Sequence, residues 1–520
     1  MAFANFFDKT SLAASQVLRG VSASDFQQRL EGASVCLSVG TAQPLSFETR
    51  TCLEIATNLT ARFYPTISFD FGQHGREYEA ALHTLASEIN PVIEFGEPSN
   101  STYALVIGDV RPSGRAECIH IGSDRWTARV SSSKTLHCAD SENPIGAAAA
   151  GCLGVANLFR LVFANELPSS SVDIDSEISF IEYDTEQQSA FKLDSGDIDL
   201  GSVHLVGAGA VGCAALWTLA RCKWVHGTLH VIDPETIAQS NLQRYILSTQ
   251  SDASQSLLKV DIAKGAVEHL NSRLKVRPHP KAWGEFAYKD SDWVFERVAV
   301  AVDSAIARRE VQASLPREVI NAWTGSDGDV GISRHVTFGK NASCLCCLYR
   351  GHAEAKNFDQ IVAESLNIAN VQQVRKLLHT GEPLTEESVS QIAVMNGILP
   401  DTLKTFVGKP LIVFYNEAIC GGLLFRLGGK AAPEVEVPMA FQSALAGIML
   451  AAELLARAAE PYSLRKTLTR LSLLRPIPDV MSFNVARDTS GQCICHDQDF
   501  IGRYVQKYLI RAPVPEQLNQ

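Results

Sequence analysis

The sequence has no excess of cationic residues. Its 520 residues include 46 Lys and Arg against 57 Asp and Glu, which gives a formal net charge of -11. A dedicated nucleic-acid binder, or a protein that binds anionic membranes, needs surplus cations to displace counterions from phosphate. The composition therefore disfavours both classes and leaves room only for a local basic groove.

Long uninterrupted apolar runs are missing too. The first thirty residues contain no basic start followed by an apolar stretch, and polar residues such as Arg160 and Glu453 interrupt the most apolar later segments. Secretory signals and membrane-spanning helices both require such a run. We therefore expect a cytoplasmic protein with no membrane partner, and a chain of this length predicts about two to four domains.

The cysteines lack the pattern of a disulfide framework. Thirteen is an odd number, and in a long chain without a secretory signal it indicates reduced thiols. Eight of the thirteen stand alone in the sequence, and a lone cysteine is usually a buried, inert thiol. The other five form two short groups.

These two groups have the spacing of zinc ligands. Cys344 and Cys347 form C-x-x-C, and Cys493 and Cys495 form C-x-C. Two such hooks could close one tetrahedral site for a structural Zn²⁺ ion and tie the last segment of the chain to the domain before it. Cys346 could replace one of its neighbours as a ligand, or the thiols could simply be buried.

A glycine-rich turn stands out in the second half of the chain. Residues 203–206 are typical of a buried strand, and they run into GAGAVG and then a helical pattern. Gly207, Gly209 and Gly212 form G-x-G-x-x-G, which lets the backbone and a helix N-terminus approach a phosphate. Asp233 ends the next predicted strand, where a carboxylate can accept hydrogen bonds from a ribose. An NAD-dependent dehydrogenase would show the same pattern up to this point.

The residues that follow differ from those of a dehydrogenase. Asn241 and Arg244 lie one helical turn apart, and Lys259 comes fifteen residues after Arg244. Two cations and an amide could converge on a triphosphate, and Asp303 at the end of a later strand could hold Mg²⁺ on it. Taken singly, each cation is better explained as a solvated surface charge.

The first half repeats this plan without its chemistry. Strands are predicted at 35–39, 67–71 and 103–108 and helices at 49–62 and 143–163, but GTAQPLS replaces the glycine-rich turn. We predict an α/β fold in which a doubly wound, Rossmann-like domain is preceded by a degenerate α/β half, as an internal pseudo-dimer. Two unrelated α/β domains are the alternative.

The predicted domain limits follow from the same pattern. The degenerate half spans 1–190 and the active half spans 191–520, with a boundary in the polar, acidic segment near 183–199. Within the active half we predict a helical insertion at 352–410 and a glycine-rich loop at 415–437, before a small-residue helix at 438–455.

Together these motifs resemble the ThiF/MoeB superfamily, which includes ubiquitin-activating enzymes. The similar features are GAGAVG, a D-x-E that precedes S-N-L-Q-R, the lysine after it, and D-S-x-x-x-R at a strand end; the resemblance covers about 200–351 and 420–508. It implies that Asp233 binds the ribose of ATP, that Asn241, Arg244 and Lys259 bind the phosphates, and that Asp303 holds Mg²⁺. Glu235 stands where a second aspartate is more usual.

The resemblance also points to a nucleophile. Cys420 lies in YNEAICGGLLFRLGG, before the small-residue helix, and similar ubiquitin-activating enzymes carry their catalytic cysteine in a segment before the matching helix. A thiolate there could attack an acyl-adenylate. Cys346 is the second choice, because a thiolate committed to zinc is not free to react.

The implied activity is ATP-dependent adenylation of the C-terminal carboxylate of a ubiquitin-like protein. A thioester on Cys420 would follow, and then transfer to a ubiquitin-conjugating enzyme. The compact chain is similar to the activating enzymes of bacterial ubiquitin-like (Bil) antiphage systems. The alternatives are a sulfur-carrier adenylyltransferase without a thioester, a catalytically silent scaffold and an NAD-dependent dehydrogenase.

Overall fold

A computed structural model describes most of the chain. The residues described are 3–40, 44–71, 75–169, 171–183, 196–290, 293–340, 342–350, 357–427, 437–459, 465–477 and 480–508. The expected boundary between residues 190 and 191 lies outside them, as do the start of the expected insertion (352–356) and part of the expected glycine-rich loop (428–436).

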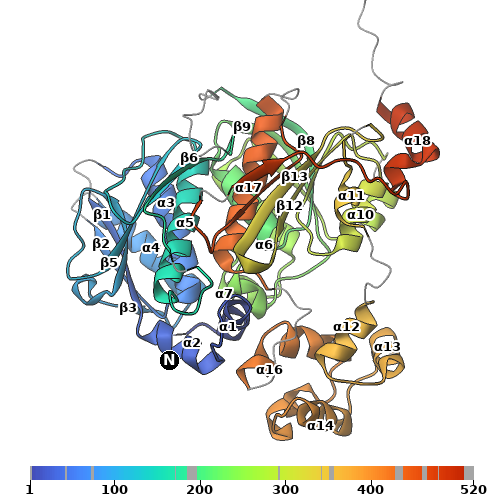
Figure 1. Cartoon of the computed structure of the whole chain (residues 1–520), viewed down its shortest axis with the longest axis horizontal. Coiled ribbons are helices and arrows are strands. Elements are labelled where there is room, and N and C mark those ends of the chain that lie inside the picture. Colours follow the sequence, from blue (N-terminus) through green and yellow to red (C-terminus); the bar gives the residue numbers. More distant parts are fainter. Residues whose placement is uncertain are drawn as a thin grey trace, which may run out of the picture.

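The first half folds around a seven-stranded sheet (Figure 1). Its strand order is β3-β2-β1-β4-β5-β6-β7; the first five of these pair in parallel, and β6 and β7 are antiparallel. The strands are β1 (Ser34–Gly40), β2 (Thr66–Phe71), β3 (Glu94–Phe95), β4 (Tyr103–Gly108), β5 (Glu117–Asp124), β6 (Thr127–Ser131) and β7 (Asp175–Ser179).

The second half repeats this topology. Its order is β10-β9-β8-β11-β12-β13-β14-β15, parallel as far as β12 and antiparallel beyond it, so that β15 is the one strand added to the plan of the first sheet. The strands are β8 (Ile198–Val206), β9 (Val225–Ile232), β10 (Leu274–His279), β11 (Arg297–Val300), β12 (Glu318–Thr324), β13 (Asp329–His335), β14 (Leu468–Ser472) and β15 (Met481–Phe483). The predicted doubly wound α/β class is confirmed, and the repeated order is consistent with an internal pseudo-dimer.

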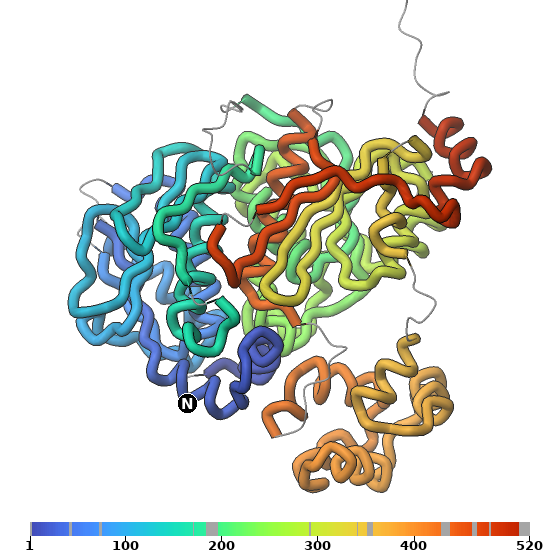
Figure 2. The backbone as a smooth tube through the Cα atoms, in the orientation of Figure 1, coloured from blue at the N-terminus to red at the C-terminus, as the bar shows by residue number. Residues whose placement is uncertain are grey.

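Helices cover the sheets and join the halves. They are α1 (Phe7–Ser15), α2 (Ala23–Glu31), α3 (Phe47–Phe63), α4 (Arg76–Ile89), α5 (Ile145–Val162), α6 (Ala210–Arg221), α7 (Gln250–Ser254), α8 (Lys259–Leu270), α9 (Trp283–Lys289), α10 (Ala305–Ala313), α11 (Leu345–Leu348), α17 (Ala440–Ala459) and α18 (Gln498–Tyr508). The blue-to-teal first half and the green-to-red second half lie side by side (Figure 2).

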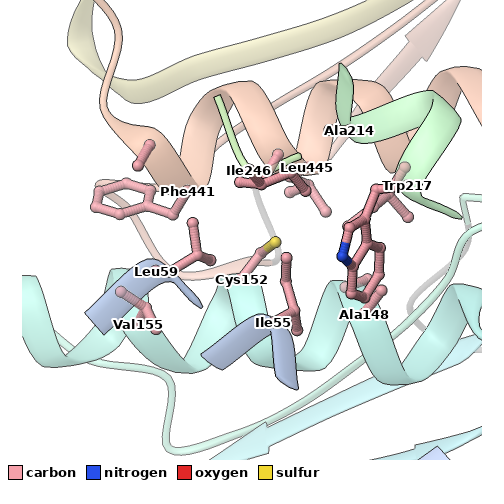
Figure 3. Packing of buried hydrophobic residues seen from close by; sticks show 14 of the residues in the cluster. Ile55, Leu59, Ala148, Cys152, Val155, Ala214, Trp217, Ile246, Phe441 and Leu445 are labelled. Atoms are coloured by element: carbon pink, nitrogen blue, oxygen red, sulfur yellow. The ribbon is translucent and has the colours of Figure 1, made fainter. Parts of the chain in front are cut away.

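Four helices form the core between the two sheets. Side chains from α3, α5, α6 and α17 meet there, among them Leu59, Cys152, Trp217 and Phe441 (Figure 3). Glycine permits the close approach, because a Cβ at Gly447 of α17 would lie 2.3 Å from a carbonyl oxygen of α6. Helices α5 and α17 are long and apolar enough to span a membrane, but 94% and 100% of their most apolar windows are buried within the protein.

A separate helical unit projects from the second half (Figure 1). It comprises α12 (Phe358–Ser365), α13 (Val371–Thr380), α14 (Glu386–Met395), η5 (Pro400–Phe406), α15 (Leu411–Phe414), a π-helical turn (Tyr415–Ile419) and α16 (Leu423–Arg426), around its own hydrophobic core. The unit is larger than the predicted insertion. The expected loop at 415–437 is instead two helical pieces, 415–419 and 423–426, joined by a turn at 420–422, because Phe414, Ala418 and Leu424 are buried in this core.

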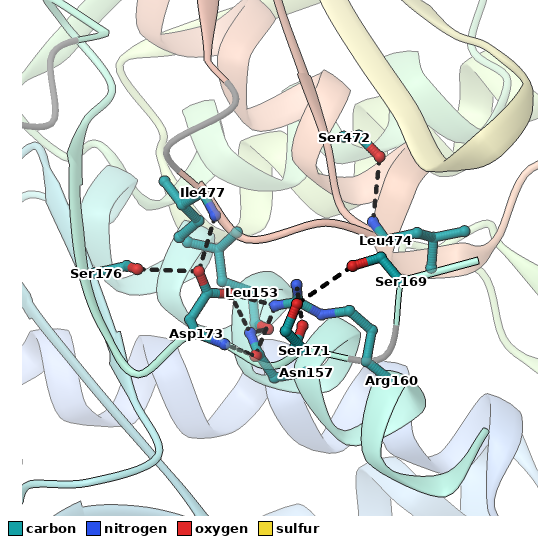
Figure 4. Close-up of polar contacts among 10 residues, drawn as sticks. All are labelled: Leu153, Asn157, Arg160, Ser169, Ser171, Asp173, Ser176, Ser472, Leu474 and Ile477. Carbon is teal, nitrogen blue, oxygen red and sulfur yellow. Dashed lines mark hydrogen bonds and ion pairs between the residues drawn. The ribbon is translucent and has the colours of Figure 1, made fainter. Parts of the chain in front are cut away.

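A buried polar network also joins the halves (Figure 4). Asp173 forms an ion pair with Arg160, and both side chains are almost fully buried. The Asp173 carboxylate also accepts hydrogen bonds from the side-chain amide of Asn157 at 2.9 Å and from the backbone N–H of Ile477, in the second half, at 2.8 Å. Burial lowers the pKa of Arg160, and Asp173 opposes this shift.

We expect Asp173→Ala to destabilise the protein by about 3–5 kcal/mol, because it leaves the Arg160 cation buried and unpaired. Urea denaturation measures the effect. Asp175→Ala is the matched control, since it removes an exposed ion pair with Lys134 and should cost under about 1 kcal/mol. Equal costs for the two substitutions would show that the buried network contributes little.

Candidate active site

The glycine turn lies at the carboxyl ends of the central strands of the second sheet. Gly207 has a φ of +95°, and a Cβ there would lie 2.6 Å from the carbonyl oxygen of Ala301. A Cβ at Gly212 would lie 2.0 Å from the carbonyl oxygen of Gly207, so that glycine is required at both positions. The turn is therefore compact enough for its backbone to approach a phosphate.

The helices that follow β1 and β8 begin differently. In the first half, the hydroxyl of Ser46 accepts the N–H of Thr49 and caps α3. In the second half, α6 begins after Gly209, and among the described residues no side chain caps it. Its first N–H groups are available to an anion, whereas a side chain already satisfies the corresponding end of α3.

Asp233 is anchored to the glycine turn. It follows β9, and its carboxylate accepts the N–H of Ala208 at 2.8 Å and that of Glu235 at 2.9 Å. Burial raises the pKa of the carboxyl, while Lys259 and the two N–H groups oppose the shift. The predicted ribose ligand is thus fixed beside the predicted phosphate turn.

Lys259 is a buried cation rather than a surface charge. It begins α8 and is 3% exposed, and its Nζ forms an ion pair with Glu235 and donates to the hydroxyl of Tyr245 at 3.1 Å. Burial alone would lower the pKa of Lys259, but Tyr245, Asp233 and Glu235 raise it above its usual value. Glu235, whose role the sequence left open, is therefore the partner of this lysine.

Asn241 and Arg244 belong to the short 3-10 helix η3 (Gln239–Gln243) and the residue after it. The Asn241 side-chain oxygen accepts the N–H of Ala238 at 2.9 Å. Arg244 is half-buried and donates to the side-chain oxygen of Gln243 at 3.2 Å. Both predicted phosphate ligands thus lie on one segment, which we call the η3 segment (239–246).

The first half holds the η3 segment in place. Arg62 of α3 is buried and donates to the carbonyl oxygens of Leu242 and Tyr245, the latter at 3.0 Å. Asn58, one turn earlier on α3, donates to the carbonyl oxygen of Ile246 at 3.0 Å. Sequence reasoning missed these two residues. The sequence feature that could have revealed them is the presence of an arginine and an asparagine on the buried face of a predicted helix.

The structure brings the predicted nucleophile to the same site. Cys420 directly follows the π-helical turn, where its N–H bonds to the carbonyl oxygen of Tyr415, and π-helical turns are frequent at functional sites. Burial raises the pKa of the Cys420 thiol, while Lys9, Tyr415 and Arg244 oppose the shift and Asp303 adds to it. Cys420 therefore lies within electrostatic range of Arg244 and Asp303.

Asp303 and Lys9 complete the cluster. Asp303 is exposed near the carboxyl end of β11, which pairs with the strand that leads into the glycine turn. Lys9 of α1, which sequence reasoning also missed, is 6% exposed and close enough to Arg244, Cys420, Lys259 and Asp303 for their charges to affect its pKa.

The four predicted zinc ligands meet between α11 and a 3-10 turn, η8 (Ile494–His496). Their Sγ atoms all lie within 4.8 Å of one another, and the Sγ separations from Cys347 to Cys344, Cys493 and Cys495 are 3.8, 3.6 and 3.6 Å. Tetrahedral Zn²⁺ with sulfur at about 2.3 Å requires about 3.8 Å between sulfurs, so these thiols fit the ion. Cys346 lies outside the cluster, with its Sγ 3.9 Å from the carbonyl oxygen of Arg309.

Two family models match different parts of the chain. The model of the ThiF family matches residues 189–495, and that of the Prokaryotic E2 family C matches residues 43–164. The second match falls on the first half, whose sheet repeats the strand order of the other half.

Three curated relatives differ in how much of each chain they share. The uncharacterized protein y4jF of Sinorhizobium fredii is 42% identical over 98% of both chains. The adenylyltransferase and sulfurtransferase UBA4 of Vanderwaltozyma polyspora is 30% identical over 28% of this chain and 33% of its own length. The Nedd8-activating enzyme E1 catalytic subunit of Drosophila melanogaster is 36% identical over 22% of this chain and 24% of its own length. This chain thus spans only a third or less of these two functionally named relatives.

Proposed function

Because the chain belongs to the ThiF family, we propose that it adenylates the C-terminal carboxylate of a ubiquitin-like protein and then takes the acyl group onto Cys420 as a thioester. The observation that carries the proposal is that α1 contacts both α16, which follows Cys420, and η3, which precedes Arg244. The charges of Arg244 and Asp303 also act on the Cys420 thiol. A nucleophile and the cations of a phosphate site would be needed together for the two steps.

In the first step, an oxygen of the carboxylate attacks the α-phosphorus of ATP and pyrophosphate leaves. The glycine turn and the uncapped start of α6 support the phosphates, and Asp233 supports the ribose. Arg244 and Lys259 neutralise the charge that develops on the phosphate oxygens. Asp303, an exposed carboxylate beside the turn, would hold Mg²⁺, which neutralises phosphate charge when it is bound.

In the second step, the Cys420 sulfur attacks the acyl carbonyl, a C–S bond forms, and AMP leaves with the former acyl C–O electrons. The product is a thioester, which an acceptor thiol of a conjugating enzyme can take over by exchange. That conjugating enzyme is part of the proposal. So is a cytoplasmic location, which the reduced cysteines support. A role in bacterial antiphage defence is also proposed, from the resemblance to such systems.

A non-reducing gel of the purified chain with ATP, Mg²⁺ and candidate ubiquitin-like proteins from neighbouring genes tests the proposal. We expect an adduct that dithiothreitol removes, and we expect Cys420→Ala to abolish it. Cys346→Ala is the matched control and should keep the adduct. An adduct that persists in Cys420→Ala would contradict the assignment of the nucleophile.

A sulfur-carrier adenylyltransferase is the second candidate, favoured by the similarity to UBA4. Such an enzyme forms the acyl-adenylate but needs no thiol near the nucleotide. Substrate-dependent pyrophosphate release without any thiol-linked adduct would favour this function over the thioester-forming one.

A further inference from the structure

Helix α1 joins the segment that carries Cys420 to the η3 segment. It contacts both α16 and η3. The contact with α16 is close, since a Cβ at Gly422 would lie 2.3 Å from the carbonyl oxygen of Asp8 and 3.2 Å from the nitrogen of Lys9. An ion pair of 3.4 Å between Asp8 and Arg426 fastens the same contact. The backbone of Lys9 is thus fixed beside the glycines that follow Cys420.

The side chain of Lys9 is buried in a cluster of charged groups. Within the described part of the chain, the Nζ atom of Lys9 forms no hydrogen bond and no ion pair. In particular, it forms no ion pair with Asp303. The charged groups that act on it come from several elements: Arg244 after η3, Lys259 on α8, Asp303 after β11 and Cys420 before α16. Burying the ammonium form of a lysine without a partner is costly, which favours the neutral amine.

Building on the proposed thioester step, we propose that Lys9 is the general base that removes the proton from the thiol of Cys420. The S–H proton passes to the Lys9 amine, and the thiolate attacks the acyl carbonyl. The C–S bond forms as the C–O bond to AMP breaks, and AMP leaves as an anion. The Lys9 ammonium that remains returns its proton to solvent when the site opens. No oxidant or further reactant is needed.

The electrostatics of the site suit this role. Burial, Arg244 and Lys259 lower the pKa of Lys9 to about 7, against the smaller opposing effects of Cys420 and Asp303, so that near neutral pH much of the amine can accept a proton. Burial raises the pKa of the Cys420 thiol, which therefore needs a base. A base is most effective when its pKa lies near the working pH.

The same cluster orders the two steps. A bound triphosphate offsets the positive charge of Arg244 and Lys259 and raises the pKa of Lys9, which keeps the amine protonated and unable to act as a base. Once pyrophosphate leaves, the two cations again act on Lys9 and favour its neutral form. The thiol therefore stays protonated while the triphosphate is bound and can be deprotonated once the acyl-adenylate has formed.

Lys9→Arg and Lys9→Met, compared with the wild type, test the proposal. Arginine keeps a cation for phosphate but does not accept a proton at these pH values, and methionine keeps the length without the charge. The two readouts are ATP–pyrophosphate exchange, which reports adenylation alone, and single-turnover thioester formation. We expect both variants to lower the ratio of the thioester rate to the exchange rate by about 10²-fold.

The pH profile gives a second readout. Because the base must be unprotonated, the wild-type thioester rate should rise with pH through about 7 and then level off. In Lys9→Arg the rise should move to higher pH, where the thiol ionises without help.

Three results would overturn or redirect the inference. If Lys9→Met lowers exchange as much as thioester formation and Lys9→Arg restores both, then Lys9 binds phosphate and is not the base. If the ratio and the pH profile stay at their wild-type values in both variants, Lys9 has no part in the thioester step. If the wild type itself forms no thioester, the proposed function fails. If the wild type forms a thioester at a rate that the Lys9 variants do not change, only the role of Lys9 fails.

Discussion

Lys259→Met should lower ATP–pyrophosphate exchange by about 10²–10³-fold, the cost of removing one preorganised group that stabilises developing charge. Lys259 is buried at the start of α8 and held between Glu235 and Tyr245. Its ammonium group is therefore already in place, and no free energy is needed to reorganise it during the reaction. Methionine fills a similar volume and leaves the rest of α8 in place. The loss should therefore appear mainly in the rate and not in stability.

The control for this substitution is Lys264→Met. Lys264 is exposed on the same helix, so its removal changes the net charge equally without touching the site. Its exchange rate should stay within about twofold of the wild type, as for an exposed charge that forms no ion pair with any described residue. A thermal melt of both variants separates catalysis from folding. If the two substitutions reduced exchange equally, the assignment of Lys259 to the phosphates would be wrong.

Purified protein should contain one zinc ion per chain, and Cys347→Ser should remove it. Structural zinc contributes about 10–16 kcal/mol of apparent binding free energy in small zinc-finger peptides, so its loss should free the segment that it ties down. That segment includes η8 and α18, because Cys493 and Cys495 are two of the four ligands. We expect rapid proteolysis near residue 490 and a lower melting temperature, with metal content measured by elemental analysis.

Cys346→Ser is the matched control for the zinc site. Cys346 is the immediate neighbour of Cys347 but lies outside the cluster, so this variant should keep both the metal and its resistance to protease. Cys347→Ser protein that retained a full zinc content would rule out the four-cysteine site.

The repeated α/β plan could be predicted from the sequence because its signals are local. The apolar run that ends at Val206, the glycines after it and Asp233 follow each other closely, and backbone geometry alone links them. The two cysteine hooks likewise have a spacing that is typical of metal ligands. The positions of β1, β2 and β4 in the first half followed from the same apolar pattern, even though the glycine turn is absent there.

The contacts between the halves could not be predicted in this way. Lys9 and Arg62 act on residues far along the chain, and neither belongs to a motif. The ion pair of Glu235 with Lys259 could not be predicted, because in the sequence each residue is consistent with an exposed, unpaired surface charge. The helical state of the Cys420 segment was missed because glycines suggested a loop, whereas Phe414 and Leu424 anchor the segment in a hydrophobic core.

The presence of both halves on one chain frees them from the symmetry of a homodimer, where every substitution occurs in both copies. Arg62 precedes β2 and Arg221 precedes β9, so the two arginines occupy matching places at the ends of α3 and α6. Arg62 binds carbonyl oxygens beside the candidate active site, whereas Arg221 forms an ion pair with Glu54. Matching positions in one chain can therefore carry different residue contacts, one holding the η3 segment and the other joining the two halves.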